Sequence, residues 1–306
     1  MLNRFLDPKN DMAFKRIFGT EKNKDILMHF LNDILGPRDG IHIIDVEFLS
    51  PIQDQEVLAK KQSIVDVLCK DQNGRKYIIE MQVAKRHGFE SRAQYYAAKA
   101  YASQMNKGGK YADLKEVIFI AILDYEVFPK KEHYKSNHTI RDDITNERDL
   151  DGLRFVFIEL PRFDKKLDEL TTIIEKWCYF FKNAPETTVQ ELAQITKDEP
   201  IIEKAYEALD SYAWSEQDLL RYEQETKNEM DAEAILMQRE IDGEKRGVEK
   251  GKKLGVEEGK KLGVEEGEKI GIKKGIEKNK IETAKKMKQE GMPAELIKKI
   301  TGIDIA

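Results

Sequence analysis

The residues with the clearest chemical potential lie on either side of a predicted β-hairpin turn. An alternating run over 63–69 contains Asp66, and a second over 76–82 contains Glu80. The step Asn73-Gly74 separates them, and Asn-Gly between two alternating runs is the strongest short-range hairpin signal. Pairing the runs about this turn places Asp66 opposite Glu80.

Two opposed acids on one sheet face predict a bound cation. Directly opposed residues lie about 5 Å apart at Cβ, and Gln82 shares the face of Glu80 because successive side chains alternate. Like charges repel at this separation, and burying carboxylates is costly unless something compensates. A divalent cation is the simplest compensation. The hairpin therefore predicts a metal site at Asp66 and Glu80.

The alternative is a solvated sheet face on which the acids pair with Lys60 or Lys76. Ile64, Leu68 and Ile78 should share that face with the acids. A solvated face is more often polar throughout, so these apolar neighbours favour the metal site.

Composition limits the class of protein. The chain has 306 residues, of which 40% are hydrophobic, enough for one large domain or two smaller ones. Its net charge of −5 gives no global signal for nucleic acid, although a local basic patch can still bind it. Cys69 and Cys178 cannot form a disulfide framework or a multi-cysteine zinc site. Each should pack as a small apolar side chain.

Several motifs are missing from the sequence. The first ten residues contain no apolar signal core, and no run approaches the roughly 18 apolar residues of a membrane span. We therefore expect a cytoplasmic protein with no membrane partner. The sequence also lacks a zinc-type histidine pair, a Walker loop and a Gly-x-Ser-x-Gly elbow.

The elements around the hairpin alternate between helices and strands. Helical spacing predicts helices over 11–19, 23–35 and 89–105. Strands are expected over 43–49, 117–123 and 153–160, with one more strand after His133. The run over 117–123 is apolar throughout, which is typical of a buried strand with both faces covered. This order predicts an α/β fold with a mixed central sheet flanked by helices.

The chain is helical in pattern from Asp164 onward. An apolar face begins at Leu167, and further helices are expected over 189–195, 201–209 and 216–241. We predict four parts: the sheet-containing core, a helical region on or beside it, a glycine repeat and a short tail. Their ranges are 1–163, 164–242, 243–279 and 280–306.

Glycine recurs at every fourth residue from Gly243 to Gly275, in an eight-residue unit rich in lysine and glutamate. A stripe with this period drifts around a helix, and each internal glycine costs about 1 kcal/mol relative to alanine. One interpretation is a marginal helix or flexible spacer. The other is a self-association stalk that makes the chain a homo-oligomer. Its aliphatic contacts would come from Leu254, Val256, Leu262, Val264, Ile270 and Ile272.

The tail contains two short predicted helices, over 281–291 and 294–300, joined by Gly291-Met292-Pro293. A helix-turn-helix of this kind can dock in the major groove of DNA. A small packing motif is the alternative.

Residues spread over the first 240 positions resemble one nuclease family. They are Asp11-x-x-Phe14-Lys15-x-x-Phe18-Gly19, Asp66, Glu80-Met81-Gln82 and Arg92-x-x-Tyr95. Together they resemble the recombination-promoting nucleases, also called PD-(D/E)XK nuclease family transposases, whose variable C-terminal region the repeat and tail also resemble. The resemblance implies a restriction-endonuclease-like core. It also implies Mg²⁺-dependent DNA cleavage, with Mn²⁺ as a substitute, in recombination, transposition or defence against foreign DNA.

The resemblance also implies roles at the site. Asp66 and Glu80 match the two metal-binding acids, and Met81 would add its backbone carbonyl. Gln82 stands where the superfamily signature carries lysine. A neutral amide can orient a water by hydrogen bonds, but it cannot stabilise phosphate charge as a lysine does. The competing function is therefore a DNA-binding or oligomerising protein with a degenerate nuclease core.

The remaining matched residues would support the site. Lys15 or Arg92 would contact the phosphate, and the alternative for each is an ordinary ion-paired cation. Tyr95 is expected to pack between helix and sheet together with Tyr96, within reach of an active-site acid. Asp11 is expected to cap a helix or to serve as a structural partner.

Overall fold

The computed structural model describes residues 3–36, 42–51, 65–85, 87–105 and 109–305. Lys60 and the first two residues of the predicted hairpin, Ser63 and Ile64, lie outside the described residues. The chain divides into two compact units, Met1–Asp231 and Ala232–Ala306.

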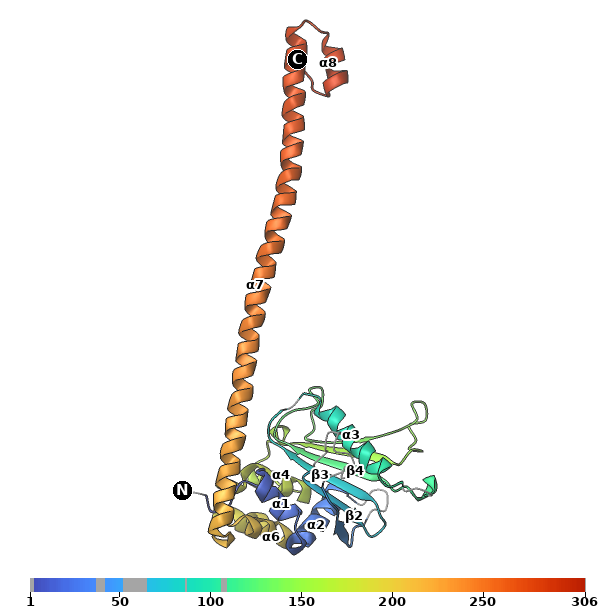
Figure 1. Cartoon of the computed structure of the whole chain (residues 1–306), viewed down its shortest axis with the longest axis vertical. Coiled ribbons are helices and arrows are strands. Elements are labelled where there is room, and N and C mark those ends of the chain that lie inside the picture. The colour runs from blue at the N-terminus through green and yellow to red at the C-terminus, as the bar shows by residue number, and fades with distance from the viewer. Residues whose placement is uncertain (1–2, 37–41, 52–64, 86, 106–108, 306) are drawn as a thin grey trace. The chain divides into compact units, whose positions relative to one another are not determined.

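A mixed sheet forms the centre of the first unit (Figure 1). Three strands run parallel at its centre, and the strands on either side of them pair antiparallel. This arrangement confirms the predicted mixed central sheet. Within the described residues, the spatial order is β1 (Val46–Phe48), β2 (Val67–Asp71), β3 (Lys76–Gln82), β4 (Val117–Leu123), β6 (Leu153–Glu159) and β5 (Lys135–Thr139).

Strands β2 and β3 form the predicted hairpin. Cys69 pairs with Tyr77, and the backbone N–H of Asp71 donates to the carbonyl of Arg75 at 2.9 Å. The Asp71 side chain accepts hydrogen bonds from the backbone N–H groups of Asn73 and Arg75 at 2.8 and 2.9 Å. Gly74 adopts a φ of +79°, in the left-handed region that glycine enters without strain. The connection is thus a loop of three residues with glycine at the left-handed position.

Helices cover both faces of the sheet (Figure 1). On one face, α3 (Phe89–Ala102) packs in an apolar cluster with Ile78 and Phe119. The opposite face carries a larger cluster that includes Phe18 and Trp177. Its helices are α1 (Asp11–Phe18), α2 (Lys24–Leu35), α4 (Ile173–Asn183) and α6 (Pro200–Leu209), with α5 (Val189–Thr196) at its margin. Every residue of β4 is buried, as its uniformly apolar sequence predicts.

A strand and a helix differ most from their predicted bounds. The strand expected over 43–49 is shorter, because β1 extends only over Val46–Phe48. The helix expected from Leu167 begins at Ile173 instead. Thr172 caps it, accepting a hydrogen bond from the N–H of Glu175, whose side chain bonds back to Thr172 in a capping box. Leu167 lies in a separate 3-10 turn.

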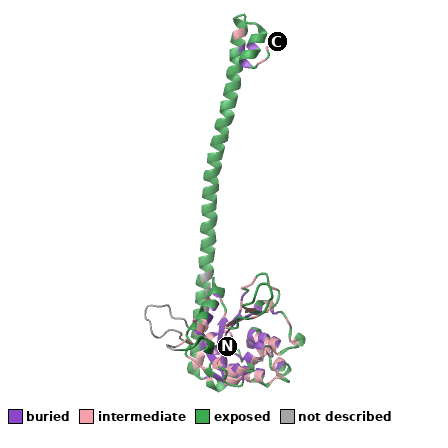
Figure 2. Ribbon diagram, turned by 90° about the vertical axis from the view of Figure 1, so that its right-hand side faces the viewer, coloured by how far each residue is buried: buried purple, intermediate pink, exposed green. Residues whose placement is uncertain are grey.

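Helix α7 (Glu216–Gln289) is continuous over 74 residues. The helix expected over 216–241, the glycine repeat and the helix expected over 281–291 all belong to it, so the repeat is helical. Every residue from 237 to 283 is exposed (Figure 2).

The tail contains a short helix at the end of the second unit. Helix α8 (Ala294–Thr301) turns back beside the end of α7 (Figure 1), and Ala284 and Ile297 are buried there. Gly302 ends α8 with a φ of +70°.

Both cysteines, Cys69 and Cys178, are buried and free, which confirms the prediction that they pack as apolar side chains. Among the described residues, none of the helices has the length and apolar character needed to cross a membrane.

Candidate active site

The structure brings the two hairpin acids together. The pairing of Val67 with Ile79 places Asp66, which immediately precedes β2, across from Glu80 in β3. The Asp66 Oδ2 accepts a hydrogen bond from the backbone N–H of Met81 at 2.8 Å. This bond fixes the aspartate beside the glutamate.

Glu80 is buried rather than solvated. It is only 3% exposed, and it lies on the face of the sheet where Leu68 and Ile78 are buried under α3. Lys76 does not pair with the acids, because its Nζ donates to the carbonyl of Ala100 and to the hydroxyl of Ser103. The alternative of a solvated acid face is therefore wrong.

Burial shifts the pKa values of both acids upward. Desolvation, with the charge of Asp66 as the next cause, raises the pKa of Glu80 to about 8. Desolvation also raises the pKa of Asp66 to about 6, opposed by the hydrogen bond from Met81. The positive charges of Lys15 and Arg92 lower both pKa values. A cation bound at this point would take the place of a proton shared by the pair.

One oxygen of the pair is left without a partner. Among the described residues, the Oε1 atom of Glu80 is buried and accepts no hydrogen bond. Buried polar atoms are almost always paired, so an exception calls for an explanation such as an ion. The Oε2 atom accepts a hydrogen bond from the Nε2 of Gln82 at 3.2 Å.

Gln82 connects the acid pair to helix α3. Its Nε2 also donates to the carbonyl of Met81 at 2.9 Å, and its Oε1 accepts a hydrogen bond from the Nη2 of Arg92 at 2.7 Å. Arg92 lies in the first turn of α3, with its guanidinium carbon 4.9 Å from the ring centroid of Phe89 and 5.9 Å from that of Tyr96. Strand β3 and helix α3 together therefore position this arginine at the site.

Lys15 and Asp11 form an ion pair on α1. The Lys15 Nζ lies 2.7 Å from the Asp11 Oδ2, and each side chain is 43% exposed. The cap of this helix is Asn10, whose Oδ1 accepts hydrogen bonds from the N–H groups of Met12 and Ala13. Asp11 is thus a structural partner, as one of the two expectations had it.

Tyr95 lies outside the site. It is 56% exposed, and its ring contacts Tyr96 at 6.1 Å between centroids. The prediction that it packs between helix and sheet is wrong, because Ala93, Ala97 and Ala100 form the buried face of α3. Tyr96 is half-buried beside the same cluster.

Sequence reasoning missed two neighbours of the site. Asp124 follows β4 directly; its N–H donates to the carbonyl of Gln82, and its Oδ2 accepts a hydrogen bond from Lys9 at 2.7 Å. An acid directly after a buried strand was a usable signal for it. Against desolvation, the hydrogen bond and charge of Asp11 raise the pKa of Lys15, and the charge of Glu225 in α7 adds to this. The Oε2 of Glu225 is buried without a hydrogen-bond partner among the described residues. Nothing local in the sequence places this glutamate near α1.

The donor set fits a small divalent cation. Within the described part of the chain, no three histidine, cysteine, aspartate or glutamate side chains are grouped so as to hold a metal ion. Asp66, Glu80 and the carbonyl of Met81 remain as candidate ligands. Mg²⁺ commonly takes one or two carboxylates and completes its shell with water and substrate phosphate, so this oxygen-only set suits it.

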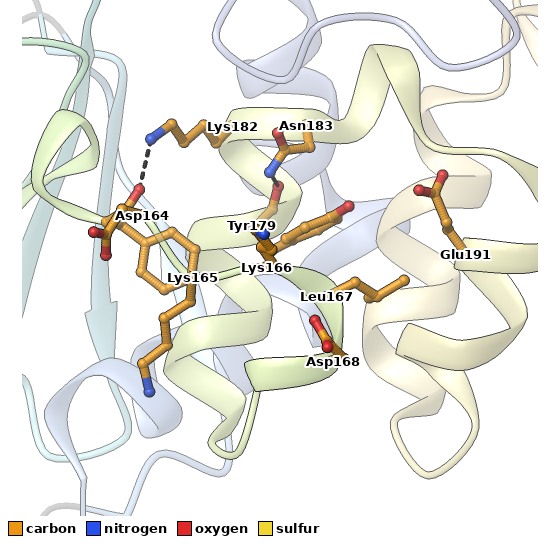
Figure 3. A pocket seen from close by; sticks show the side chains of 10 residues that line it. Asp164, Lys165, Lys166, Leu167, Asp168, Tyr179, Lys182, Asn183 and Glu191 are labelled. Carbon is orange, nitrogen blue, oxygen red and sulfur yellow. Dashed lines mark hydrogen bonds between the residues drawn. The ribbon is translucent and has the colours of Figure 1, made fainter.

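A pocket of about 430 Å³ lies elsewhere in the first unit (Figure 3). Lys182 and Tyr179 of α4 line it, together with residues 163–168. The Nζ of Lys182 donates to the carbonyl of Phe163 there. Neither acid of the pair lines this pocket, so it is separate from the candidate site.

The chain was compared with protein families, curated proteins and solved structures. A family model described as PD-(D/E)XK nuclease family transposase matches residues 8–239. That range contains the acid pair, Gln82 and Arg92. Comparisons with curated proteins and with solved structures found no match.

Proposed function

The chain belongs to the PD-(D/E)XK nuclease family transposases, and on this basis we propose that it is a metal-dependent DNA endonuclease that hydrolyses phosphodiester bonds. Its mixed sheet flanked by helices is consistent with the restriction-endonuclease-like fold. The observation that carries the proposal is the Asp66–Glu80 pair, in which the buried Oε1 of Glu80 has no hydrogen-bond partner among the residues that the structure describes. A pair of carboxylates can hold a catalytic Mg²⁺, which completes its shell with water and substrate phosphate.

The proposed mechanism assigns a role to each residue of the site. Asp66, Glu80 and the carbonyl of Met81 would hold Mg²⁺, or Mn²⁺ as its substitute. Such an ion supplies Lewis-acid chemistry, since it offsets charge on the scissile phosphate and acidifies the attacking water. Lys15 or Arg92 would contact the phosphate by charge-assisted hydrogen bonds.

Gln82 fits the role of positioning group better than the predicted role of water orienter. Its amide nitrogen donates hydrogen bonds to Glu80 and to the carbonyl of Met81, and its oxygen accepts a hydrogen bond from Arg92. One of the two donated hydrogen bonds would have to break before Gln82 could donate to a water. In the mechanism it therefore holds Glu80 in place.

The proposed setting is recombination, transposition or defence against foreign DNA in the cytoplasm. The alternative function is a DNA-binding or oligomerising protein whose nuclease core is weak or inactive. Gln82 favours that alternative, because an amide stands where a lysine would stabilise phosphate charge.

We also propose that α7 mediates homo-oligomer formation. Its six repeat aliphatics, Leu254, Val256, Leu262, Val264, Ile270 and Ile272, are 51–63% exposed. Eight residues advance about 80° beyond two full turns of an α-helix, so these side chains wind around α7 rather than forming one straight seam. Sizing the full chain against a truncation before Gly243 tests this proposal, and an unchanged oligomeric state contradicts it.

Nicking of a supercoiled plasmid in Mg²⁺ tests the enzymatic function. We expect the wild type to nick, and Asp66→Ala and Glu80→Ala to lose activity. Asp113→Ala is the matched control, because this exposed acid precedes β4 outside the site. Nicking that survives in both site variants contradicts the site assignment, and failure of the wild type to cut favours the DNA-binding alternative.

A further inference from the structure

Gln82 occupies the position at which the nuclease superfamily signature carries lysine, but its amide is uncharged. We infer that Arg92 delivers the missing positive charge to the scissile phosphate from α3, and that Gln82 acts as its positioning residue. This inference rests on the proposed nuclease function. In this arrangement the positively charged side chain comes from helix α3 and not from strand β3, which carries Glu80.

The hydrogen bonds of Gln82 define its positioning role. One side of the amide is held by Glu80 and the carbonyl of Met81, and the other side accepts from Arg92 at 2.7 Å. The amide therefore bridges an acid of the pair and the guanidinium. A lysine at this position could not accept a hydrogen bond from arginine, because an ammonium group has donors only.

Arg92 retains its charge where the site needs it. In the described part of the chain, the hydrogen bond recorded for its side chain goes to the neutral oxygen of Gln82, and its Nε is buried without a partner. Contacts with the rings of Phe89 and Tyr96 hold the guanidinium. A planar guanidinium with unused N–H donors matches the oxygens of a phosphate better than an ammonium does.

Arg92 lies one side chain away from the acid pair. Its Nη2 donates to the Oε1 of Gln82 at 2.7 Å, and the Nε2 of the same amide donates to the Oε2 of Glu80 at 3.2 Å. A phosphate held at the acid pair would therefore lie within reach of the same charge.

Lys15, the other candidate for the phosphate contact, already forms an ion pair with Asp11. Its ammonium lies 2.7 Å from the carboxylate of Asp11, and both side chains are partly exposed. Contacting a phosphate would require this ion pair to open. Arg92 requires no such step, because its partner is uncharged.

Cleavage rates of three variants test the inference. We expect Arg92→Gln to lower kcat by about 10²-fold, the size of effect seen when one transition-state donor is removed. Arg92→Lys should retain more activity than Arg92→Gln. The double variant Gln82→Lys/Arg92→Gln, which returns the cation to the strand, should exceed Arg92→Gln alone. Wild-type activity in Arg92→Gln, or no recovery in the double variant, overturns the inference.

Metal-free binding gives a second readout that does not depend on catalysis. In EDTA, the affinity for a short fluorescein-labelled duplex is measured by anisotropy over a range of salt concentrations. Loss of one phosphate contact should reduce the slope of log K against log salt by about 0.9 in Arg92→Gln. Arg92→Lys should keep the wild-type slope. Arg141→Gln is the control, because this exposed arginine follows β5 at the other edge of the sheet.

The two experiments separate the inference from the function it rests on. A wild type that cuts no DNA in Mg²⁺ or Mn²⁺ contradicts the proposed function, whatever the slopes are. An Arg92→Gln slope equal to the wild-type slope overturns the role of Arg92, even when the wild type cuts.

Discussion

Replacing Glu80 by glutamine should stabilise the metal-free protein at alkaline pH while removing its function. The wild-type carboxyl is buried opposite Asp66, and its pKa is raised from 4.5 to about 8. Because the folded chain binds this proton more tightly than the unfolded chain, folding is favoured at low pH. That stabilisation is lost as the pH rises from the unfolded pKa through the folded pKa. Glutamine does not titrate, so the stability of the Glu80→Gln variant does not fall in this way as the pH rises.

The size of the effect follows from the displacement of the pKa. Each pKa unit corresponds to about 1.4 kcal/mol, so the wild type should lose about 4 kcal/mol relative to Glu80→Gln between pH 4.5 and pH 8. The charge of Asp66 is the second cause of the displacement, after desolvation. Asp66→Asn should therefore lower the pKa of Glu80 and reduce the effect.

Urea unfolding in EDTA measures this difference. The free energy of unfolding of the wild type and of Glu80→Gln is compared near pH 5, pH 6.5 and pH 8.5. Glu90→Gln is the matched control, because this glutamate in the first turn of α3 is exposed to solvent, whereas Glu80 is buried. A difference between wild type and Glu80→Gln that stays constant across this range would refute the reasoning.

Three further predictions address the remaining elements. Asn10→Ala should cost about 1–2 kcal/mol of unfolding free energy, because it removes the cap of α1; an unchanged urea midpoint would argue against that cap. The affinity for Mn²⁺ should rise between pH 6 and pH 8, since the ion must displace protons from carboxyls with raised pKa values; calorimetry that finds equal affinity at both pH values would contradict this. Alanine at the repeat glycines should raise the free energy of opening measured by hydrogen exchange in α7 by about 1 kcal/mol per site, because each added Cβ meets no other described part of the chain within 4 Å. Dissociation of an oligomer in those glycine variants would instead show that the glycines face a second copy. The glycines to change are Gly251, Gly255, Gly259 and Gly263.

Local sequence signals were sufficient for the centre of the fold. The hairpin followed from Asn73-Gly74 and from the alternation on either side, and its register brought Asp66 and Glu80 together. Strand β4 followed from its uninterrupted apolar run. The hairpin and strand β4 are specified by residues that are neighbours in the sequence. Burial of both faces of the sheet then leaves few possible arrangements of these strands.

Other features depended on contacts that periodicity does not encode. The apolar rings of α3 suggested that Tyr95 faced the sheet, but the small alanines of that helix face it instead. The bond between Gln82 and Arg92 requires knowing how α3 packs against β3. Glu225 reaches the neighbourhood of Lys15 from a helix more than two hundred residues later in the chain.

Helix propensity alone also did not predict that α7 is continuous. The repeated glycines left a marginal helix or flexible spacer and a self-association stalk as alternatives, and the structure has an unbroken helix over Glu216–Gln289. Oppositely charged residues four apart, such as Glu249 and Lys253 at 2.8 Å, offset part of the glycine cost.

The central claim is that Asp66 and Glu80 bind the metal ion that cuts DNA. The most direct test measures Mn²⁺ binding by electron paramagnetic resonance and duplex cleavage on the same preparations of wild type, Asp66→Asn and Glu80→Gln. We predict that the wild type binds Mn²⁺ and cleaves, and that both variants lose binding and cleavage together. Wild-type Mn²⁺ binding or wild-type cleavage in both variants would contradict the account.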